Sequence, residues 1–297
     1  MRPTTIEEAS SLLAEASRAG NRARIGAELA TDALDRVLEH EAGDLTCTVE
    51  GGIRLSTLGA ALARVGQRLS LDPPGDPTVG ACLAGRLSGP LSHHYGGPRD
   101  LVLGVTLVLG DGTVASSGGK VVKNVAGYDL GKLVCGSEGR LGLIARVSLR
   151  LHPLPAASAT LVAETDDAAS VVGALRRSQL QPSALDVLHP GRVAVLFEGA
   201  APAVEAQLDA ARALVGGARA DATVWEEARE RQGRARGRLA FAPADLPTVL
   251  ATLPEAVVRP AAGIAYVPDG TLAAPAPAAR RLHDALAATF DPAGVLA

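Results

Sequence analysis

The sequence predicts an α+β protein of two domains, and three observations support this. Helix-like and strand-like patterns alternate along the 297 residues, a length that suits two modest domains with a sizeable core. Glycine-rich stretches gather in the first half, whereas alanine-rich helices alternate with short strands in the second. A proline-containing linker, Pro153–Ser158, separates the halves. We therefore expect one domain over residues 1–155 and a smaller α+β domain over residues 156–297.

The first domain should open with a helix from Thr5 to Ala19. Its apolar residues recur at helical spacing, Thr5 can cap the start, and Gly20 can end it. The elements expected next are a short strand at 23–25, a helix-like segment over Ala33–His40, a strand over Leu45–Glu50 and a helix over Ser56–Val65.

The middle of the chain combines loops with one clear hairpin. Asp72–Pro77 carries three prolines and cannot form regular structure. The residues from Thr78 to Gly97, rich in glycine, alanine and serine, read as an ordered loop. Leu101–Leu109, a Gly-Asp-Gly turn and Thr113–Ser116 form a hairpin pattern. Leu143–Leu151 then alternates as a strand.

The second domain shows a different alternation of elements. Its expected strands are Thr160–Ala163, Val193–Phe197, Arg238–Phe241 and Ile264–Val267. Its expected helices are Ala168–Ser178, Ala203–Val215, Ala244–Thr252 and Ala278–Thr289.

Composition excludes several functions. Aromatic residues make up 2% and the net charge is −3, which argues against a base-stacking or polyanion-binding surface and hence against a nucleic-acid partner. No apolar run approaches the roughly 18 residues that span a bilayer, and the N-terminus lacks a signal-peptide pattern, so we expect a cytoplasmic protein without a transmembrane segment. Cys47, Cys82 and Cys135 are widely spaced and read as reduced, buried thiols. No Cys/His cluster has metal-ligand spacing, so no metal site is expected.

Two glycine-rich stretches carry the chemistry, Pro77–Pro90 and Gly118–Ile144. Small residues let backbone amides approach a ligand closely, and consecutive amides can form an anion-binding nest for a diphosphate. Tight turns in an alanine-rich protein would give the same glycine content, so composition alone leaves both interpretations open. Neither a strand–GxGxxG–helix unit nor a GxxxxGK[ST] motif is present.

A family resemblance decides between these interpretations. Arg99–Val105 resembles an R-D-x-x-L-G-V motif, and Lys123–Leu133 resembles K-N-V-A-G-Y-D-L-x-K-L. Gly136–Ile144 and Pro77–Gly80 resemble two further motifs, G-S-x-G-x-L-G-x-I and T-V-G-G, with Ala81 replacing the last glycine. These are motifs of FAD-linked oxidases of the PCMH (vanillyl-alcohol-oxidase-like) type, and the nearest resemblance is to glycolate oxidase E subunits. It covers about residues 6–155, and the ending Phe290–Leu296 resembles F-D-P-x-G-x-L.

The resemblance implies a PCMH-type FAD-binding domain of two α+β subdomains, followed by an α+β cap domain. It implies FAD as cofactor, with Thr78, Val79, Gly80 and Ala81 offering amides to the diphosphate and Gly139, Gly142 and Ile144 holding the adenosine end. The remaining cofactor-binding residues that it implies are Gly26, Ala84, Gly85, Ser88, Gly89, Arg99, Asp100, Lys123, Gly127, Tyr128, Asp129 and Glu138. No catalytic residue is implied by the motifs.

The resemblance also implies an oxidoreductase subunit that accepts or relays electrons through its flavin. Its expected partners are a second flavin subunit and an iron–sulfur subunit, and its expected substrate is a small 2-hydroxy acid. Such a complex could hold the protein peripherally at the inner membrane. One departure supports an alternative. The first diphosphate loop, normally G-x-G-T, is shortened around Gly26, and Glu28 adds negative charge. A chain that had lost FAD this way would be a non-catalytic scaffold subunit.

Several single residues keep two interpretations. His93 or His94 could carry a covalent flavin, although two adjacent loop histidines are more often solvated. Asp129 could pair with Tyr128 beside the flavin or simply cap the following turn. Lys123 could stabilise the reduced flavin, contact phosphate or be solvated. The arginine run from Arg229 to Arg238 could be a solvated face, or it could dock a partner or an acidic substrate.

Overall fold

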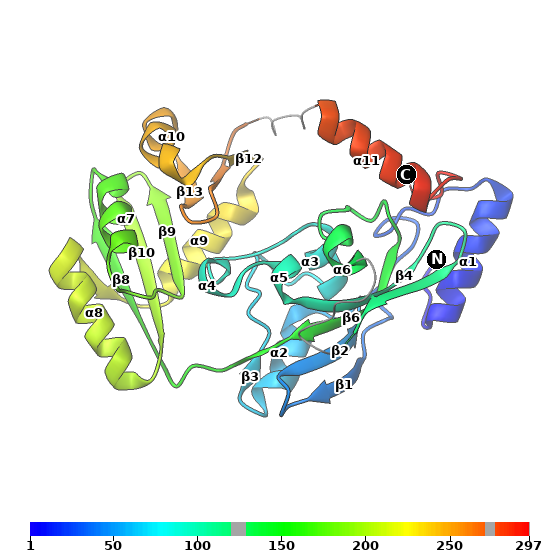
Figure 1. Cartoon of the computed structure of the whole chain (residues 1–297), viewed down its shortest axis with the longest axis horizontal. Coiled ribbons are helices and arrows are strands. Elements are labelled where there is room, and N and C mark those ends of the chain that lie inside the picture. Colours follow the sequence, from blue (N-terminus) through cyan, green and yellow to red (C-terminus); the bar gives the residue numbers. More distant parts are fainter. Residues whose placement is uncertain (120–128, 271–276, 297) are drawn as a thin grey trace.

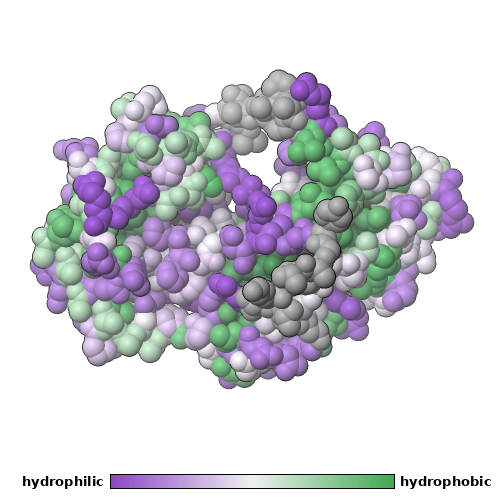
Figure 2. Space-filling model, in the orientation of Figure 1, coloured by the Kyte–Doolittle hydropathy of each residue, from purple (hydrophilic) through white to green (hydrophobic). Residues whose placement is uncertain are grey.

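The computed structural model describes residues 1–119, 129–270 and 277–296 and shows two lobes (Figure 1 and Figure 2). The first lobe is built on a five-stranded sheet and the second on a seven-stranded sheet. All neighbouring strands in both sheets are antiparallel. Together with the helices this is the mixed α+β fold that the sequence predicts.

The first lobe opens with α1 (Ile6–Ala19), as expected. Thr5 caps it by accepting a hydrogen bond from the Glu8 amide, and Gly20 ends it in the left-handed conformation at φ 67°. The sheet that follows has the order β1-β2-β6-β4-β5. Its strands are β1 (Val37–Glu41), β2 (Thr46–Glu50), β6 (Leu143–Arg150), β4 (Val102–Val108) and β5 (Val114–Gly118). The predicted hairpin is therefore β4–β5.

Each face of this sheet packs against helices. One face builds a core with α2 (Leu55–Ala63), α3 (Val79–Ala84) and α6 (Leu130–Val134), through side chains such as Leu58, Val79 and Val134. The other face packs against α1 at one end of the sheet. A small separate sheet pairs β3 (Gln67–Arg68) with β7 (His152–Pro153), just before the chain enters the second lobe.

The second sheet has the order β11-β8-β10-β9-β13-β14-β12. Its strands are β8 (Ala157–Glu164), β9 (Ala184–His189), β10 (Arg192–Gly199), β11 (Ala218–Ala220), β12 (Gly237–Ala240), β13 (Ala256–Arg259) and β14 (Ile264–Val267). Helices α7 (Ala168–Arg177), α8 (Ala201–Val215) and α10 (Leu246–Thr252) share one core, whereas α9 (Thr223–Arg234) packs into a different cluster. A turn of 3-10 helix, η1 (Pro243–Asp245), precedes α10.

The last residues return to the first lobe. Helix α11 (Pro277–Phe290) lies over that lobe in Figure 1, and its Leu286 and Phe290 pack against the core around α2, α3 and α6. Val295 and Leu296 are buried in the α1 cluster. The division at residue 155 stays a prediction, and residues 286–296 contact the lobe in which the chain begins.

Three expectations about local structure were wrong. Residues 23–25 do not form a strand, because Ile25 makes only an isolated bridge with Leu29. Ala33–His40 is not helical, because Val37–Glu41 pairs with β2 as an edge strand and this pairing overrides the helix-forming composition. Thr78–Gly97 is not only loop, because it contains α3 and α4 (Ser92–Tyr95), and α5 (Pro98–Leu101) follows directly. The Thr78 hydroxyl caps α3 by accepting from the Ala81 amide at 3.2 Å.

Candidate functional site

The two glycine-rich stretches meet in the first lobe. The amide of Gly136 donates to the carbonyl of Leu83 at 2.9 Å, and that of Glu138 donates to Ala84 at 3.0 Å. The loop after α6 is therefore fixed to the end of α3 by two backbone hydrogen bonds. Motifs separated by about fifty residues form one structural unit here.

The amides at the start of α3 already have partners within the protein. Val79 donates to Ile53 at 2.9 Å, Gly80 donates to Gly51 at 2.7 Å, and Ala81 donates to the Thr78 hydroxyl. A Cβ on Gly80 would lie 2.8 Å from the Gly51 carbonyl oxygen, so this approach requires glycine. The amides of Val79, Gly80 and Ala81, three of the four expected at the diphosphate, are therefore engaged within the protein in the described conformation.

A cavity of about 700 Å³ lies beside this unit, between α6, the loop over 135–141 and α11. Three residues expected at the cofactor line it, namely Arg99, Asp129 and Glu138. Its other lining residues are Lys132, Leu133, Cys135, Gly136, Ser137, Arg140, Leu141, Leu282, His283, Leu286 and Ala287. This size is ordinary for a cofactor pocket.

The charges around the cavity are partly paired. Asp129 caps α6 by accepting from the Lys132 amide at 3.0 Å and also pairs with the Lys132 ammonium at 3.0 Å. Burial would raise the pKa of Asp129, but these hydrogen bonds and the lysine charge outweigh it and lower the pKa. Arg140 lies 3.7 Å from Asp284 of α11. Among the described residues, Arg99 has no ion-pair partner, and the buried Ser137 hydroxyl oxygen has no hydrogen-bond partner.

Left-handed backbone shapes the wall of the cavity. Gly136, Glu138 and Gly139 have φ values of 91°, 52° and 81°, and Glu138 is one of few non-glycine residues in this region. A Cβ at Gly139 would meet Ile25 at 3.5 Å, so this loop also touches the segment after α1.

The other expected residues lie at several places. Gly26 (φ 82°) makes the turn between Ile25 and Leu29, and Asp100 accepts from the Gly97 amide at 2.8 Å. Ile144 is buried in β6, and its carbonyl oxygen would lie 2.0 Å from a Cβ on Gly51. Gly85 ends α3, and Gly142 (φ 145°) precedes β6. Lys123, Gly127 and Tyr128 lie outside the described residues.

Ser88 and Gly89 lie at the contact between the lobes. The Ser88 carbonyl accepts from Gln232 of α9 at 2.8 Å and from Arg259 at 3.2 Å. A Cβ on Gly89 would lie 1.8 Å from the Asp72 carbonyl oxygen, so only glycine fits there. Ser88 therefore docks the second lobe against the first, whereas Gly89 packs against Asp72 of the first lobe.

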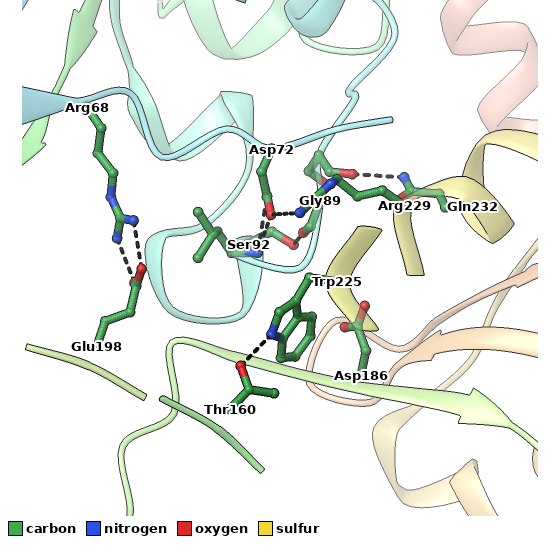
Figure 3. A network of polar contacts seen from close by, with 12 residues as sticks. Arg68, Asp72, Gly89, Ser92, Thr160, Asp186, Glu198, Trp225, Arg229 and Gln232 are labelled. Carbon is green, nitrogen blue, oxygen red and sulfur yellow. Dashed lines mark hydrogen bonds and ion pairs between the residues drawn. The ribbon is translucent and has the colours of Figure 1, made fainter. Parts of the chain in front are cut away.

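A second cavity, of about 460 Å³, opens at this contact. Figure 3 shows the polar residues around it, from β3 and the following loop on one side and from β8, β10 and α9 on the other. Asp72, Glu198 and Arg229 line it, together with Trp225, whose indole N–H donates to the Thr160 hydroxyl at 2.9 Å. Arg229 lies 3.7 Å from Asp72.

Two carboxyl groups at this contact are strongly perturbed. Burial raises the pKa of Asp72 to about 7, against the opposing charges of Arg259 and Arg229. Burial likewise raises the pKa of Asp186 to about 6, and Arg259 opposes the shift. Asp186 is fully buried, neither of its oxygens has a hydrogen-bond partner in the described part of the chain, and Arg259 is its ion-pair partner at 3.6 Å.

The histidines and cysteines have structural surroundings. His152 contacts the Ser70 hydroxyl at 3.0 Å and the Tyr95 ring, and burial lowers its pKa to about 4. Burial also lowers the pKa of His93. Cys47 and Cys82 are buried, Cys135 is half-buried, and none of the three is in a disulfide, as predicted. The described residues contain no cluster that could hold a metal ion.

The arginine run is mostly paired. Arg229 contacts Asp72, Arg234 contacts Glu230, and Arg231 contacts Glu227 at 2.7 Å. It lies largely on α9, a helix that the sequence analysis did not predict. The run thus serves contacts within the protein as well as solvent.

Residues 1–118 match the family described as FAD binding domain. These residues thus resemble the FAD-binding domains of PCMH-type FAD-linked oxidases. Glycolate oxidase subunit GlcE of Escherichia coli (strain K12) is 34% identical over 201 residues, which cover 66% of this chain and 56% of that subunit. Glycolate oxidase subunit GlcD of Bacillus subtilis (strain 168) is 32% identical over 55% of this chain and 36% of its own length.

Further relatives of this chain include a mitochondrial D-lactate dehydrogenase [cytochrome] of Arabidopsis thaliana, 36% identical over 52% of this chain and 28% of that protein. The chain thus spans between about a quarter and a little over half of these relatives. Among solved structures, alkyldihydroxyacetonephosphate synthase has a TM-score of 0.75 at 18% identity, covering 99% of this chain and 74% of its own. Xylooligosaccharide oxidase from Myceliophthora thermophila C1 has a TM-score of 0.61 at 19% identity, covering 74% and 52%. These neighbours share the fold.

The cavity beside α6 fits the cofactor of this family. It combines an arginine without an ion-pair partner among the described residues, an unpartnered buried hydroxyl and an apolar side, which suit a dinucleotide. Sequence reasoning missed Ser137, Arg140 and the α11 side chains of this cavity. The motif Gly136–Gly139 brackets Ser137, but nothing in the sequence indicated that α11 would return to this lobe.

Proposed function

We propose that this chain is an FAD-binding subunit of an oxidoreductase that resembles the glycolate oxidase E subunit. The observation that carries the proposal is the α6 cavity, lined by Arg99, Asp129 and Glu138 in a chain whose first 118 residues match an FAD-binding domain. FAD would lie along the first lobe with its diphosphate near Arg99 and Arg140, because cations stabilise its negative charge. Relatives named as glycolate oxidase subunits support the reaction class.

The proposed substrate is a small 2-hydroxy acid, bound in the cavity between the lobes. Arg229 would pair with its carboxylate, since guanidinium groups suit planar anions. Asp72 has a pKa of about 7, raised by burial, and could therefore accept the hydroxyl proton near neutral pH. Bound FAD would supply the hydride acceptor.

We further propose that electrons pass to a second flavin subunit and an iron–sulfur subunit. None of the described helices is long and apolar enough to cross a membrane.

An absorption spectrum of the purified chain tests the proposal. We expect flavin absorption bands and release of FAD on heating, identified by chromatography against FAD and FMN. Apoprotein prepared this way should recover the spectrum when FAD is added. A colourless protein that FAD does not reconstitute would contradict the proposal and favour a scaffold subunit.

The substrate assignment has a separate test. In an Asp72→Asn variant we expect unchanged FAD content but at least tenfold slower flavin reduction by glycolate or D-lactate under anaerobic conditions, because the proton acceptor is lost. The exposed Asp209→Asn variant serves as a matched control. Equal reduction rates in wild type and Asp72→Asn would exclude Asp72 as the base and leave FAD binding untouched.

A further inference from the structure

The C-terminal helix forms one side of the α6 cavity, although it follows the whole second lobe in the chain. Leu282, His283, Leu286 and Ala287 of α11 face the loop over 135–141 across this space. Arg140 of the loop and Asp284 of the helix, 3.7 Å apart, connect the two sides. The cavity exists only because α11 lies there.

The lining has two chemical halves. Leu133, Leu141, Leu282 and Leu286 offer an apolar surface of the kind that covers a base. The polar half contains three cations and two carboxylates, namely Arg99, Lys132, Arg140, Asp129 and Glu138. Lys132 pairs with Asp129 and Arg140 with Asp284, so Arg99 is the cation left to meet a diphosphate among the described residues. This pairing of an apolar wall with cations matches a nucleoside diphosphate.

Two further observations indicate that this cavity binds a ligand. Ser137 lines the cavity, and its hydroxyl oxygen is buried without a hydrogen-bond partner in the described residues, which is unfavourable unless a ligand or water satisfies it. Leu282 is 61% exposed at the rim, the most exposed of the large hydrophobic side chains in the described residues. A bound base beside Leu282 would cover it.

We propose that α11 is the outer wall of the adenylate end of the FAD site, so that an adenosine diphosphate group lies between this helix and the 136–140 loop. The inference rests on the proposed function and adds to it a part of the chain that the family match over residues 1–118 does not contain. The turn at Gly26 is short and its Glu28 is engaged by Arg24 at 2.6 Å, so that segment supplies little to the cofactor. The C-terminal helix takes over the role of closing the site.

Nucleotide titrations of three variants test this. Leu282→Glu places a charge on the apolar wall, Ser137→Ala removes the unpartnered hydroxyl, and Leu214→Glu is the matched control at another exposed leucine, 47% exposed on α8. FAD and FMN binding to apoprotein is followed by quenching of flavin fluorescence, and ADP binding by calorimetry. Melting temperatures confirm that each variant folds.

We expect Leu282→Glu to weaken FAD and ADP at least tenfold and Ser137→Ala about fivefold, whereas FMN, which lacks the adenylate, binds both variants like wild type. Leu214→Glu should bind all three ligands normally. Unchanged FAD and ADP binding in Leu282→Glu, or equal weakening of FMN, would overturn the inference while the proposed function stands. A wild-type chain that binds ADP but not FAD, with ADP lost in Leu282→Glu, would support the α11 site and reject the proposed function. A wild type that binds neither would reject both.

Discussion

Arg68 of β3 and Glu198 of β10 join the two lobes through two hydrogen bonds of 2.7 and 2.6 Å. Their side chains are only 16% and 7% exposed, so solvent screens the pair weakly. The Tyr95 hydroxyl completes the group by donating to Glu198 at 3.2 Å and accepting from Arg68 at 2.9 Å. Figure 3 shows the ion pair bridging the space between the lobes.

Removing one partner of this pair should destabilise the protein strongly. In Glu198→Ala the Arg68 guanidinium stays buried without its counter-ion, and the expected loss in free energy of unfolding is about 3 kcal/mol. Urea denaturation measures it. The exposed pair Arg219–Glu205 provides the control, because Glu205→Ala should leave the transition midpoint nearly unchanged. Equal effects in both variants would show that burial does not set the strength of the pair.

Asp186 should make stability depend on pH. Its pKa is raised by burial from 3.8 to about 6, so the folded protein holds this proton more tightly than the unfolded chain. The stabilising contribution of the protonated side chain is complete below pH 4 and lost as the pH rises through about 6. The Asp186→Asn side chain is neutral at every pH. The free energy of unfolding of this variant, minus that of wild type, should therefore rise by up to roughly 3 kcal/mol between pH 4 and pH 8. Urea titrations at several pH values measure this difference, and a flat difference would contradict the prediction.

Replacing Asp291 should detach Val295 and Leu296 from the first lobe. Its buried carboxylate accepts from the amides of Val295 at 2.9 Å and Leu296 at 2.7 Å. Asp291→Ala should lower the free energy of unfolding by about 2 kcal/mol and speed amide exchange over residues 291–296. Hydrogen exchange followed by mass spectrometry measures this. Gly110→Ala should act alike, since its Cβ would lie 2.2 Å from an Asp291 carboxylate oxygen. Gly43→Ala, with no atom within 4 Å of its Cβ and no positive φ, should leave this exchange unchanged.

The thiols should differ in reactivity. Burial raises the pKa of Cys47 and Cys82 to about 12, and that of the half-buried Cys135 to about 11. At pH 8 in the native protein we expect iodoacetamide to label Cys135 slowly and the other two only after unfolding in urea. Peptide mass spectrometry assigns each label. Rapid native labelling of Cys82 would mean that the α3 core opens locally.

Local sequence signals predicted much of the fold. The cap at Thr5, the stop at Gly20 and the turn between β4 and β5 are determined by neighbouring residues, and the structure contains all three. Strand β14 was expected at Ile264–Val267 and lies there. By contrast, β1 became a strand only by pairing with β2, and propensity alone cannot report such a partner.

The site was predictable only in part. Motif resemblance indicated Arg99, Asp129 and Glu138, which the cavity brings together, and the capping alternative for Asp129 is what the structure contains. The α11 wall could not be expected, because its contacts link residues about 150 positions apart. Helix α9 was missed because its charged residues resembled a solvated run, whereas Val224 and Trp225 anchor it.

Both ends of the chain lie on the same lobe, where the Ala23 amide donates to the Val295 carbonyl at 2.7 Å. The seven-stranded lobe is thus inserted in the chain between two parts of the other lobe. A force applied to the two termini would therefore act on the five-stranded lobe and not on the seven-stranded lobe. The same arrangement would let evolution exchange the inserted lobe as a cassette, with the cofactor half and both tails kept in place.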